Sequence, residues 1–291
     1  MPYHFEILPL HPAARRLESY TGYLIRLAHA NGINSVDELS AAFFPAQDRR
    51  ITREIGDFPP LSMGALPTLS LCPEGTLRAM TFHHLGAKFG RARHPQALSR
   101  FLAGSVSPHV RYCPPCVAAD GYYMLPWRFT MVDGCMRHRC RLRDTCGHCG
   151  QPLPLLAAPL RIGMCSHCGG DVRTCVAERL NLHEWRRVIG RQYDAMFLLS
   201  AGPHQDDDHD EARYLGWRMA RLRRTRGMLA VEMAERTGLT MSRVEGIERG
   251  NVLGRGASFA DYLAYADELG VTLRDVLTGA DGANCHGIDE N

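Results

Sequence analysis

Four pairs of potential metal ligands lie close together in the middle of the chain. Cys113-x-x-Cys116 is followed by Cys135-x-x-His138, and Cys146-x-x-Cys149 is followed by Cys165-x-x-Cys168. A gap of two residues lets both side chains of a tight turn bind one ion, and two such turns supply the tetrahedron that Zn²⁺ prefers. Pairing in order predicts two zinc ions per chain, one held by Cys113, Cys116, Cys135 and His138 and the other by Cys146, Cys149, Cys165 and Cys168.

Other cysteines and one histidine compete for these positions. Cys140 could replace His138, and His148 lies between two ligands, but His138 preserves the two-residue gap. Each site then has four protein ligands and no position for a catalytic water, so we expect structural zinc. A segment this small cannot build its own core, so metal binding should supply most of its folding free energy. The remaining thiols are interpreted as one core residue and two spares, Cys72, Cys175 and Cys285.

Composition limits the class of protein. The 291 residues are 45% hydrophobic and 22% charged, which suits two or three domains and excludes a fully disordered chain. No apolar run approaches the ~18 residues of a membrane-spanning helix, and the first residues lack the pattern of a secretion signal. We therefore expect a cytoplasmic protein with reduced thiols and no membrane partner. The formal charge of +3 becomes zero once seven thiolates bind two Zn²⁺ ions, so attraction to nucleic acid requires local patches.

The region before the metal ligands has helical periodicity. Apolar residues recur at spacings of three and four from Leu17 to Ala28, which predicts a helix that leaves Arg16 and Arg26 free for partners. Ser35 and Glu38 have the spacing of a capping box, so a second helix should begin there. Pro73-Glu74 opens a further helix that should carry Leu77, Met80 and Leu85.

Basic residues dominate the stretch around the first metal site. Residues 78–143 contain eleven Arg or Lys and two Asp, a net charge of +9, with tyrosines and a tryptophan between them. Cations interleaved with rings form nucleic-acid surfaces, and Arg91 and Arg93 are the candidate contacts. The alternative is that the rings cover the zinc modules while the arginines are solvated. The rings concerned are Tyr112, Tyr122, Tyr123 and Trp127.

Near the C-terminus, residues 227–250 have the layout of a helix-turn-helix, with Gly238 suited to the turn and Thr240 to the second helix cap. With the flanking helices, this region resembles the five-helix domain of phage repressors. That resemblance implies DNA binding, but Ala230 replaces the usual phosphate-gripping Gln, and Gly246 falls at a base-reading position. We expect phosphate contacts with little base readout, or a domain that now packs against protein. The candidate contacts are Arg218, Arg221, Arg224, Met241, Ser242 and Arg243.

Together these patterns predict a mainly α-helical protein with small zinc-stapled modules. The predicted order is a helical N-terminal unit, two zinc-ribbon-like modules, a connecting helix, an acidic linker, a five-helix helix-turn-helix domain and a flexible tail. The corresponding ranges are 1–105, 106–178, 179–201, 202–212, 213–279 and 280–291.

Taken in order, these motifs resemble the TniQ family of target-selection adaptors of bacterial transposons. The resemblance rests on Glu18 to Ala28, on Leu69 to Leu85, and on Arg111-Tyr112-Cys113-Pro114-Pro115-Cys116 with the ligand pairs that follow. It implies a protein that is not an enzyme and that links a recognised target to an AAA+ ATPase, which recruits the transposase. The implied partners are that ATPase and DNA reached directly or through a guide-RNA complex. A second copy in a homodimer is a further candidate partner, although the sequence does not give the oligomeric state.

An enzyme and a transcription regulator are the two alternatives to an adaptor. The chain lacks the Gly-x-x-x-x-Gly-Lys-[Ser/Thr] loop of ATP-binding proteins and the His-Glu-x-x-His motif of metalloproteases, which disfavours an enzyme. A zinc-containing helix-turn-helix transcription regulator would need base readout, which Met241, Ser242 and Gly246 do not promise.

Overall fold

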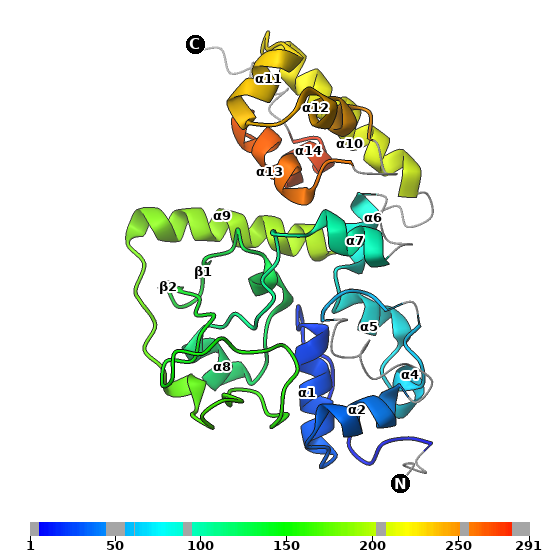
Figure 1. The fold of residues 1–291 in the computed structure, drawn as a ribbon, viewed down its shortest axis with the longest axis vertical. Coiled ribbons are helices and arrows are strands. Elements are labelled where there is room, and N and C mark those ends of the chain that lie inside the picture. Colours follow the sequence, from blue (N-terminus) through cyan, green and yellow to red (C-terminus); the bar gives the residue numbers. More distant parts are fainter. Residues whose placement is uncertain are drawn as a thin grey trace, which may run out of the picture. The chain divides into compact units, whose positions relative to one another are not determined.

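Helices form most of the regular structure of the protein. The computed structural model describes residues 6–44, 56–60, 62–89, 95–201, 208–250 and 256–280. Over these residues the mainly helical fold is confirmed, with one antiparallel sheet of two short strands (Figure 1). In the same part of the chain no helix combines the length and apolar character needed to cross a bilayer. The chain divides into two units, residues 1–84 with 106–200 and residues 85–105 with 201–291.

Side-chain caps set the start of the first two helices. The Ser19 hydroxyl accepts a hydrogen bond from the Gly22 amide at 3.1 Å and begins α1 (Tyr20–Ala30). Ser35 caps α2 (Val36–Phe43) in the same way, as predicted, through the Glu38 amide. The prediction that the first helix includes Leu17 was wrong, because that residue has a left-handed backbone with φ 58° before the cap.

The helix predicted from Pro73 to Leu85 is two helices. Following α4 (Leu66–Ser70), α5 (Glu74–Ala79) ends at Met80, and α6 (His83–Lys88) carries Leu85. Leu77 and Met80 are buried in the core of the first unit, whereas Leu85 is buried in the second unit. Residues of α1, α2 and α4 complete the core of this part of the first unit, and its largest members include Tyr20, Tyr23, Leu24, Leu27, Phe43 and Leu66.

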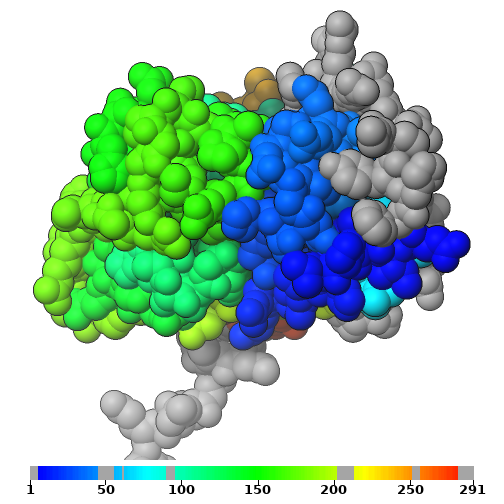
Figure 2. Space-filling model, turned by 90° about the horizontal axis from the view of Figure 1, so that it is seen from below, coloured from blue at the N-terminus to red at the C-terminus, as the bar shows by residue number. Residues whose placement is uncertain are grey.

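The metal-ligand region of the first unit contains little regular structure. It has α8 (Pro114–Asp120), the 3₁₀ turns η1 (Leu125–Arg128) and η2 (Val172–Thr174), and strands β1 (Gly134–Cys135) and β2 (Cys140–Arg141). The following helix, α9 (Leu182–Leu199), begins at a capping box of Asn181 and Glu184 and contacts β1 and η1. Backbone hydrogen bonds from Ser19 to Tyr123 and from Leu125 to Leu17 join this region to the N-terminal helices, and Figure 2 shows the two segments adjoining.

A buried ion pair connects the two halves of the first unit. Asp57 is fully buried and accepts hydrogen bonds from the Thr21 amide at 2.8 Å and the Thr21 hydroxyl at 2.7 Å. Its second oxygen pairs with the Arg128 guanidinium, which also donates to the Ser107 carbonyl. Both charges are therefore neutralised and hydrogen-bonded inside the unit, as burial requires.

The second unit is built from α7 (Pro95–Phe101), α10 (Asp208–Thr225), α11 (Ala230–Thr237), α12 (Met241–Glu248), α13 (Phe259–Glu268) and α14 (Leu273–Thr278). Since α10 begins at Asp208, the last residues of the predicted acidic linker are helical. Gly216 lets α10 approach the end of α12, because a Cβ there would lie 2.4 Å from the Ile247 carbonyl oxygen. Gly238, with φ 68°, makes the turn between α11 and α12, as predicted.

Four aromatic rings attach residues 85–105 to the C-terminal helices. Phe89 lies 5.0 Å from Phe101, 5.8 Å from Phe259 and 5.2 Å from Tyr262, measured between ring centroids. All four rings are buried. The sequence placed residues 85–105 in the N-terminal helical region, whereas their packing places them in the second unit.

We expect Asp57→Ala to lower the free energy of unfolding by about 3–5 kcal/mol, because it leaves the Arg128 guanidinium buried without its partner. Urea unfolding of the full chain would measure the change. As a control, Asp120→Ala removes the partner of the exposed Arg137 and should cost at most about 1 kcal/mol. Equal effects of the two substitutions would contradict the role given to the buried pair.

Candidate metal centres and nucleic-acid surfaces

The first four predicted ligands form one cluster. Cys113 is the N-cap of α8 and Cys116 lies in its first turn, while Cys135 ends β1 and His138 follows in the turn to β2. The Cys116 sulfur lies 3.7 Å from that of Cys135 and 3.1 Å from Nδ1 of His138. All four ligand atoms lie within 4.8 Å of one another.

The second four predicted ligands form an equivalent cluster from two turns. The Cys146 and Cys168 sulfurs are 3.8 Å apart, and those of Cys149 and Cys165 are 3.7 Å apart. In a tetrahedral site with Zn–S bonds of about 2.3 Å, sulfur atoms lie about 3.8 Å apart. The clusters therefore fit two Zn²⁺ ions, in the ordered pairing that the sequence predicts.

Three of the four ligand turns share one backbone geometry. The residue after the second ligand has a left-handed conformation, with φ 74° at Gly150, 69° at Gly169 and 53° at Arg139. Glycine adopts this conformation without strain, whereas arginine does not. Arg139 instead stacks over the Trp185 ring on α9, with its guanidinium carbon 4.5 Å from the ring centroid. This contact was not predicted from the sequence. The signal that could have indicated it is the arginine at position 139, because glycine follows both ligand pairs of the second cluster.

Backbone amides support the ligand sulfurs. The amide of His138 points to the Cys135 sulfur, and those of His148 and His167 point to the sulfurs of Cys146 and Cys165, each at 3.4 Å. Hydrogen bonds from the Cys113 and Cys116 thiols lower the pKa of Cys135. Hydrogen bonds from backbone amides and from neighbouring thiols both stabilise the thiolate form of cysteine, which is the form that binds metal.

The competing ligand candidates lie outside both clusters. The Cys140 sulfur lies 3.6 Å from that of Cys113 but does not belong to the group of four mutually close atoms. Nε2 of His148 lies 2.9 Å from the Asp171 carbonyl oxygen, so this ring supports the fold of the second module. Cys72 is a buried core residue, as interpreted, and Cys175 is half-buried, while Cys285 lies outside the described residues.

We expect the purified protein to contain two zinc ions per chain, measured by elemental analysis. His138→Ala and Cys146→Ser should each lower the content to about one ion and raise the susceptibility of residues 106–178 to proteolysis, because an unfilled site leaves its module unfolded.

Cys140→Ser and Cys175→Ser are the matched controls and should retain two ions. Loss of zinc in Cys140→Ser, with retention in His138→Ala, would show that the fourth ligand of the first site is Cys140.

Most of the basic stretch is used within the fold. Arg128 pairs with Asp57, Arg137 with Asp120, and Arg141 with Glu178 and Glu184. Arg111 and Arg143 donate to backbone carbonyls, and Lys88 is buried. Tyr112, Tyr123 and Trp127 are also buried. The rings therefore cover the zinc modules, and these arginines do not form the expected cation-and-ring surface. Arg91 and Arg93 lie outside the described residues.

The prediction that Arg26 is free for partners was wrong. Its guanidinium forms a two-point ion pair with the fully buried Glu18, with N–O distances of 2.6 and 2.7 Å, and also donates to the Ala13 carbonyl. A buried carboxylate requires such a partner. Arg16 remains exposed.

The predicted nucleic-acid contacts of the second unit differ in exposure. Met241, Ser242 and Arg243 lie exposed at the start of α12, where Arg243 also pairs with Asp261 at 3.1 Å. Arg221 and Arg224 are exposed on α10 and available to an anionic partner. Arg218 is only 7% exposed, and its guanidinium lies against Gly279 at the end of α14, so this side chain is not presented to a phosphate as predicted. Thr240 occupies the predicted cap position, but its side chain makes no capping bond.

A largely buried carboxylate joins three helices of the second unit, with 12% of its side chain exposed, and the sequence-based interpretation did not identify it. Glu248 on α12 accepts hydrogen bonds from Arg223 on α10 and from the Tyr265 hydroxyl on α13. Burial opposes its ionisation, but these donors hold the pKa of Glu248 below its ordinary value. Its contribution to stability is therefore present above the unfolded-state pKa of about 4.3 and lost as the pH falls through the lower folded-state value.

We expect Glu248→Gln to destabilise the second unit by about 2 kcal/mol at pH 7, because the charged hydrogen bonds to Arg223 are weakened. Thermal unfolding of the full chain at pH 7 and below pH 4 would show that the difference between variant and parent narrows in acid. The exposed Glu245→Gln is the control and should change stability little at either pH. A constant difference across this pH range would contradict the role of the carboxylate.

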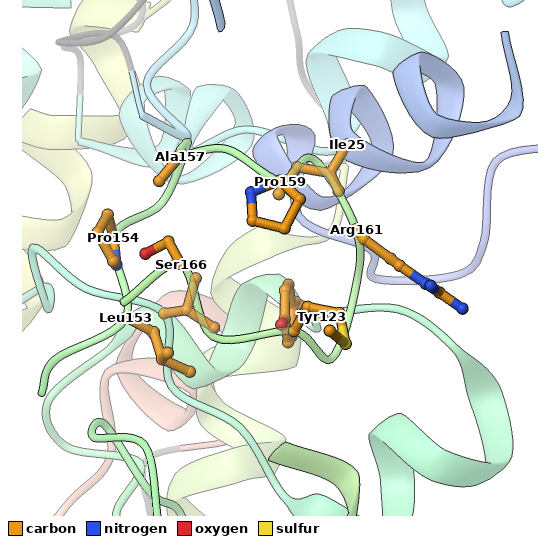
Figure 3. A pocket seen from close by; sticks show the side chains of 10 residues that line it. Ile25, Tyr123, Leu153, Pro154, Ala157, Pro159, Arg161 and Ser166 are labelled. Carbon is orange, nitrogen blue, oxygen red and sulfur yellow. The ribbon is translucent and has the colours of Figure 1, made fainter. Parts of the chain in front are cut away.

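A shallow hollow lies between α1 and the second zinc module, with about 320 Å³ of space including its open mouth. Figure 3 shows Ile25 and Pro159 on one side and Tyr123 on the other, while Arg161 points away from its centre. Its lining contains no carboxylate, histidine or cysteine. The Tyr123 hydroxyl already accepts a hydrogen bond from the Gly163 amide. The hollow therefore offers no histidine, cysteine or carboxylate beside the Ser166 hydroxyl that could serve as its base.

Comparison with models of protein families matches part of the chain. Residues 9–142 match the TniQ family, a segment that contains the whole first metal cluster and ends before the second. No curated protein sequence matches the chain. The family match supports the TniQ resemblance for that segment and fits a transposition-associated role.

Proposed function

We propose that this protein is a non-catalytic adaptor in DNA transposition that connects a recognised target to an AAA+ ATPase and its transposase. The observation that carries the proposal is the TniQ match over residues 9–142, which includes the N-terminal helices and the first metal cluster. An adaptor needs a rigid body with partner-binding faces and does not need a reactive group.

The metal clusters support this proposal through their chemistry. Each offers four protein ligands, so a bound Zn²⁺ ion has no position for water or substrate. When bound, zinc would supply folding free energy to the modules and hold their turns in place. The chain's own residues do the rest, since α9, Tyr112 and Trp127 cover the modules.

DNA contact is proposed for the exposed start of α12, at Met241, Ser242 and Arg243. Two of these side chains cannot make the two-point hydrogen bonds that identify a base, and Arg243 is shared with Asp261. Binding should therefore depend on phosphates, with similar affinity for unrelated duplexes and a steep loss of affinity as salt rises.

A zinc-containing transcription regulator is the second candidate, favoured by the exposure of α12 within a five-helix arrangement. The two functions predict different DNA affinities. A regulator should prefer its operator over scrambled duplex by a factor of roughly a thousand or more, whereas an adaptor of this kind should not.

We expect the full-length, zinc-loaded chain to retain the AAA+ ATPase encoded nearest to it in a pull-down, and expect target choice in a transposition assay to be lost without the chain. Ser242→Asp places a negative charge at the start of α12 and should weaken DNA binding by phosphate repulsion without affecting capture of the ATPase. If the ATPase is not captured and target choice is unchanged without the chain, the adaptor function is refuted. A strong operator preference that Ser242→Asp abolishes would establish the regulator.

A further inference from the structure

An exposed cationic stripe runs along α10 in the second unit. Each of its members is three or four residues from another member, so all of them lie on one side of the helix. The stripe consists of the exposed residues Arg213, Tyr214, Trp217, Arg221 and Arg224. The sequence of residues 213–226 contains no acidic residue, so the stripe has cations and no anion. The opposite side of α10 is buried against the rest of the unit through Leu215, Met219 and Leu222.

The two rings of the stripe are held in place by their neighbours, although each is about half exposed, at 53% for Tyr214 and 52% for Trp217. They stack with centroids 6.1 Å apart and planes 23° from parallel. Arg218 lies over the Tyr214 ring at 5.5 Å and Arg221 over the Trp217 ring at 5.6 Å. Tyrosine, tryptophan and arginine are enriched among the residues that dominate protein interfaces, and rigid rings lose little entropy on binding. The stripe therefore has the composition of a binding surface.

The stacking leaves little room for a nucleic-acid base at Trp217. Tyr214 precedes this residue by one turn and Arg221 follows it by one turn, so they cover opposite faces of its ring. Proteins that bind single strands offer open ring faces on which the bases stack. Trp217 presents its edge instead, and the edge of an aromatic ring carries partial positive charge. The stripe therefore favours carboxylates and apolar side chains over stacked bases.

Arg221 and Arg224 supply the charge that a partner must match. Within the described residues neither guanidinium forms an ion pair, whereas the neighbouring Arg223 pairs with Glu248. Cations beside exposed rings are complementary to a partner that carries both carboxylates and apolar groups. Gly216, which packs against the end of α12, lies on another side of α10. The stripe is therefore distinct from the DNA contact proposed for the start of α12.

We propose that the stripe is the docking site for an acidic helical segment of a protein partner. A helix laid along α10 matches the spacing of the stripe, because the seven residues from Trp217 to Arg224 span about 10.5 Å, or two turns of either helix. Its carboxylates lie opposite Arg221 and Arg224, and its apolar side chains lie against the rings. Acidic residues are favoured near the N-terminus of a helix, so the partner helix runs antiparallel to α10.

Selection from a displayed library of random helical peptides tests the site, with the full-length, zinc-loaded protein as the target. We expect the enriched peptides to carry two acidic residues three positions apart and an apolar residue four positions after the second, which is the spacing of the stripe reversed. Their Kd, measured by fluorescence anisotropy, should be on the order of 10 μM, because one helix face is a small interface. This inference is independent of the proposed adaptor function.

A charge exchange tests whether the contact is direct. Arg221→Glu should weaken peptide binding at least tenfold by setting like charges opposite each other, and Trp217→Ala should do so by removing the apolar contact. A peptide with lysine in place of both acidic residues should bind the parent at least tenfold more weakly. The same peptide should bind the double variant Arg221→Glu, Arg224→Glu within threefold of the original affinity, because opposite charges again face each other.

Arg236→Glu reverses an exposed charge on α11 and is the matched control, which should leave the Kd unchanged. Circular dichroism should show that all variants keep their helices. The proposal would be overturned if no enriched peptide depended on Trp217 and Arg221, or if the lysine peptide failed to bind the double variant. It would also be overturned if Trp217→Ala abolished binding of a fluorescent oligothymidine and left peptide binding unchanged, since the stripe would then serve nucleic acid.

Discussion

The buried pair of Asp57 and Arg128 sets the arrangement of the first unit. Neither charge can remain inside the fold without the other, so α1, the segment around Asp57 and the η1 turn must assemble together. The Thr21 hydrogen bonds hold the acid against α1, and the Ser107 carbonyl holds the base at the entrance to the metal-ligand region. The ion pair therefore fixes α1 relative to the η1 turn, which belongs to the metal-ligand region.

The metal ligands and the arginines contribute to function in different ways. The ligands form two sites with four protein ligands each, which hold the ligand turns in place. The arginines around them form ion pairs with carboxylates or donate hydrogen bonds to backbone carbonyls. Little of the local charge is left for a partner in that region. On the second unit, by contrast, α10 and the start of α12 carry exposed arginines. A protein of this kind stabilises itself with one set of cations and offers another set for association.

The parts of the fold that follow from nearby residues were predicted well. Ligand pairs separated by two residues, the Ser35 cap and the Gly238 turn each depend on a few neighbouring positions, and the structure has all three. Asp57 and Arg128 lie 71 residues apart, and no local pattern indicates that they meet. The ring cluster of Phe89 and Tyr262 is equally non-local. Arg26 was taken as free for a different reason. The predicted helix included Glu18 two turns away from it, whereas α1 begins at Tyr20 and Glu18 pairs with Arg26 from the segment before the helix.

The ring cluster makes the second unit discontinuous in sequence. Its helices come from residues 85–105 and 201–291, so the chain enters it, returns to the first unit and enters it again. A gene fragment that begins at Asp208 would encode α10 to α14 without Phe89 and Phe101, and would leave the apolar sides of Phe259 and Tyr262 uncovered. The C-terminal helices are therefore poorly suited to exchange between proteins as a cassette. In evolution, replacing them would require a matching change in the middle of the TniQ-like segment.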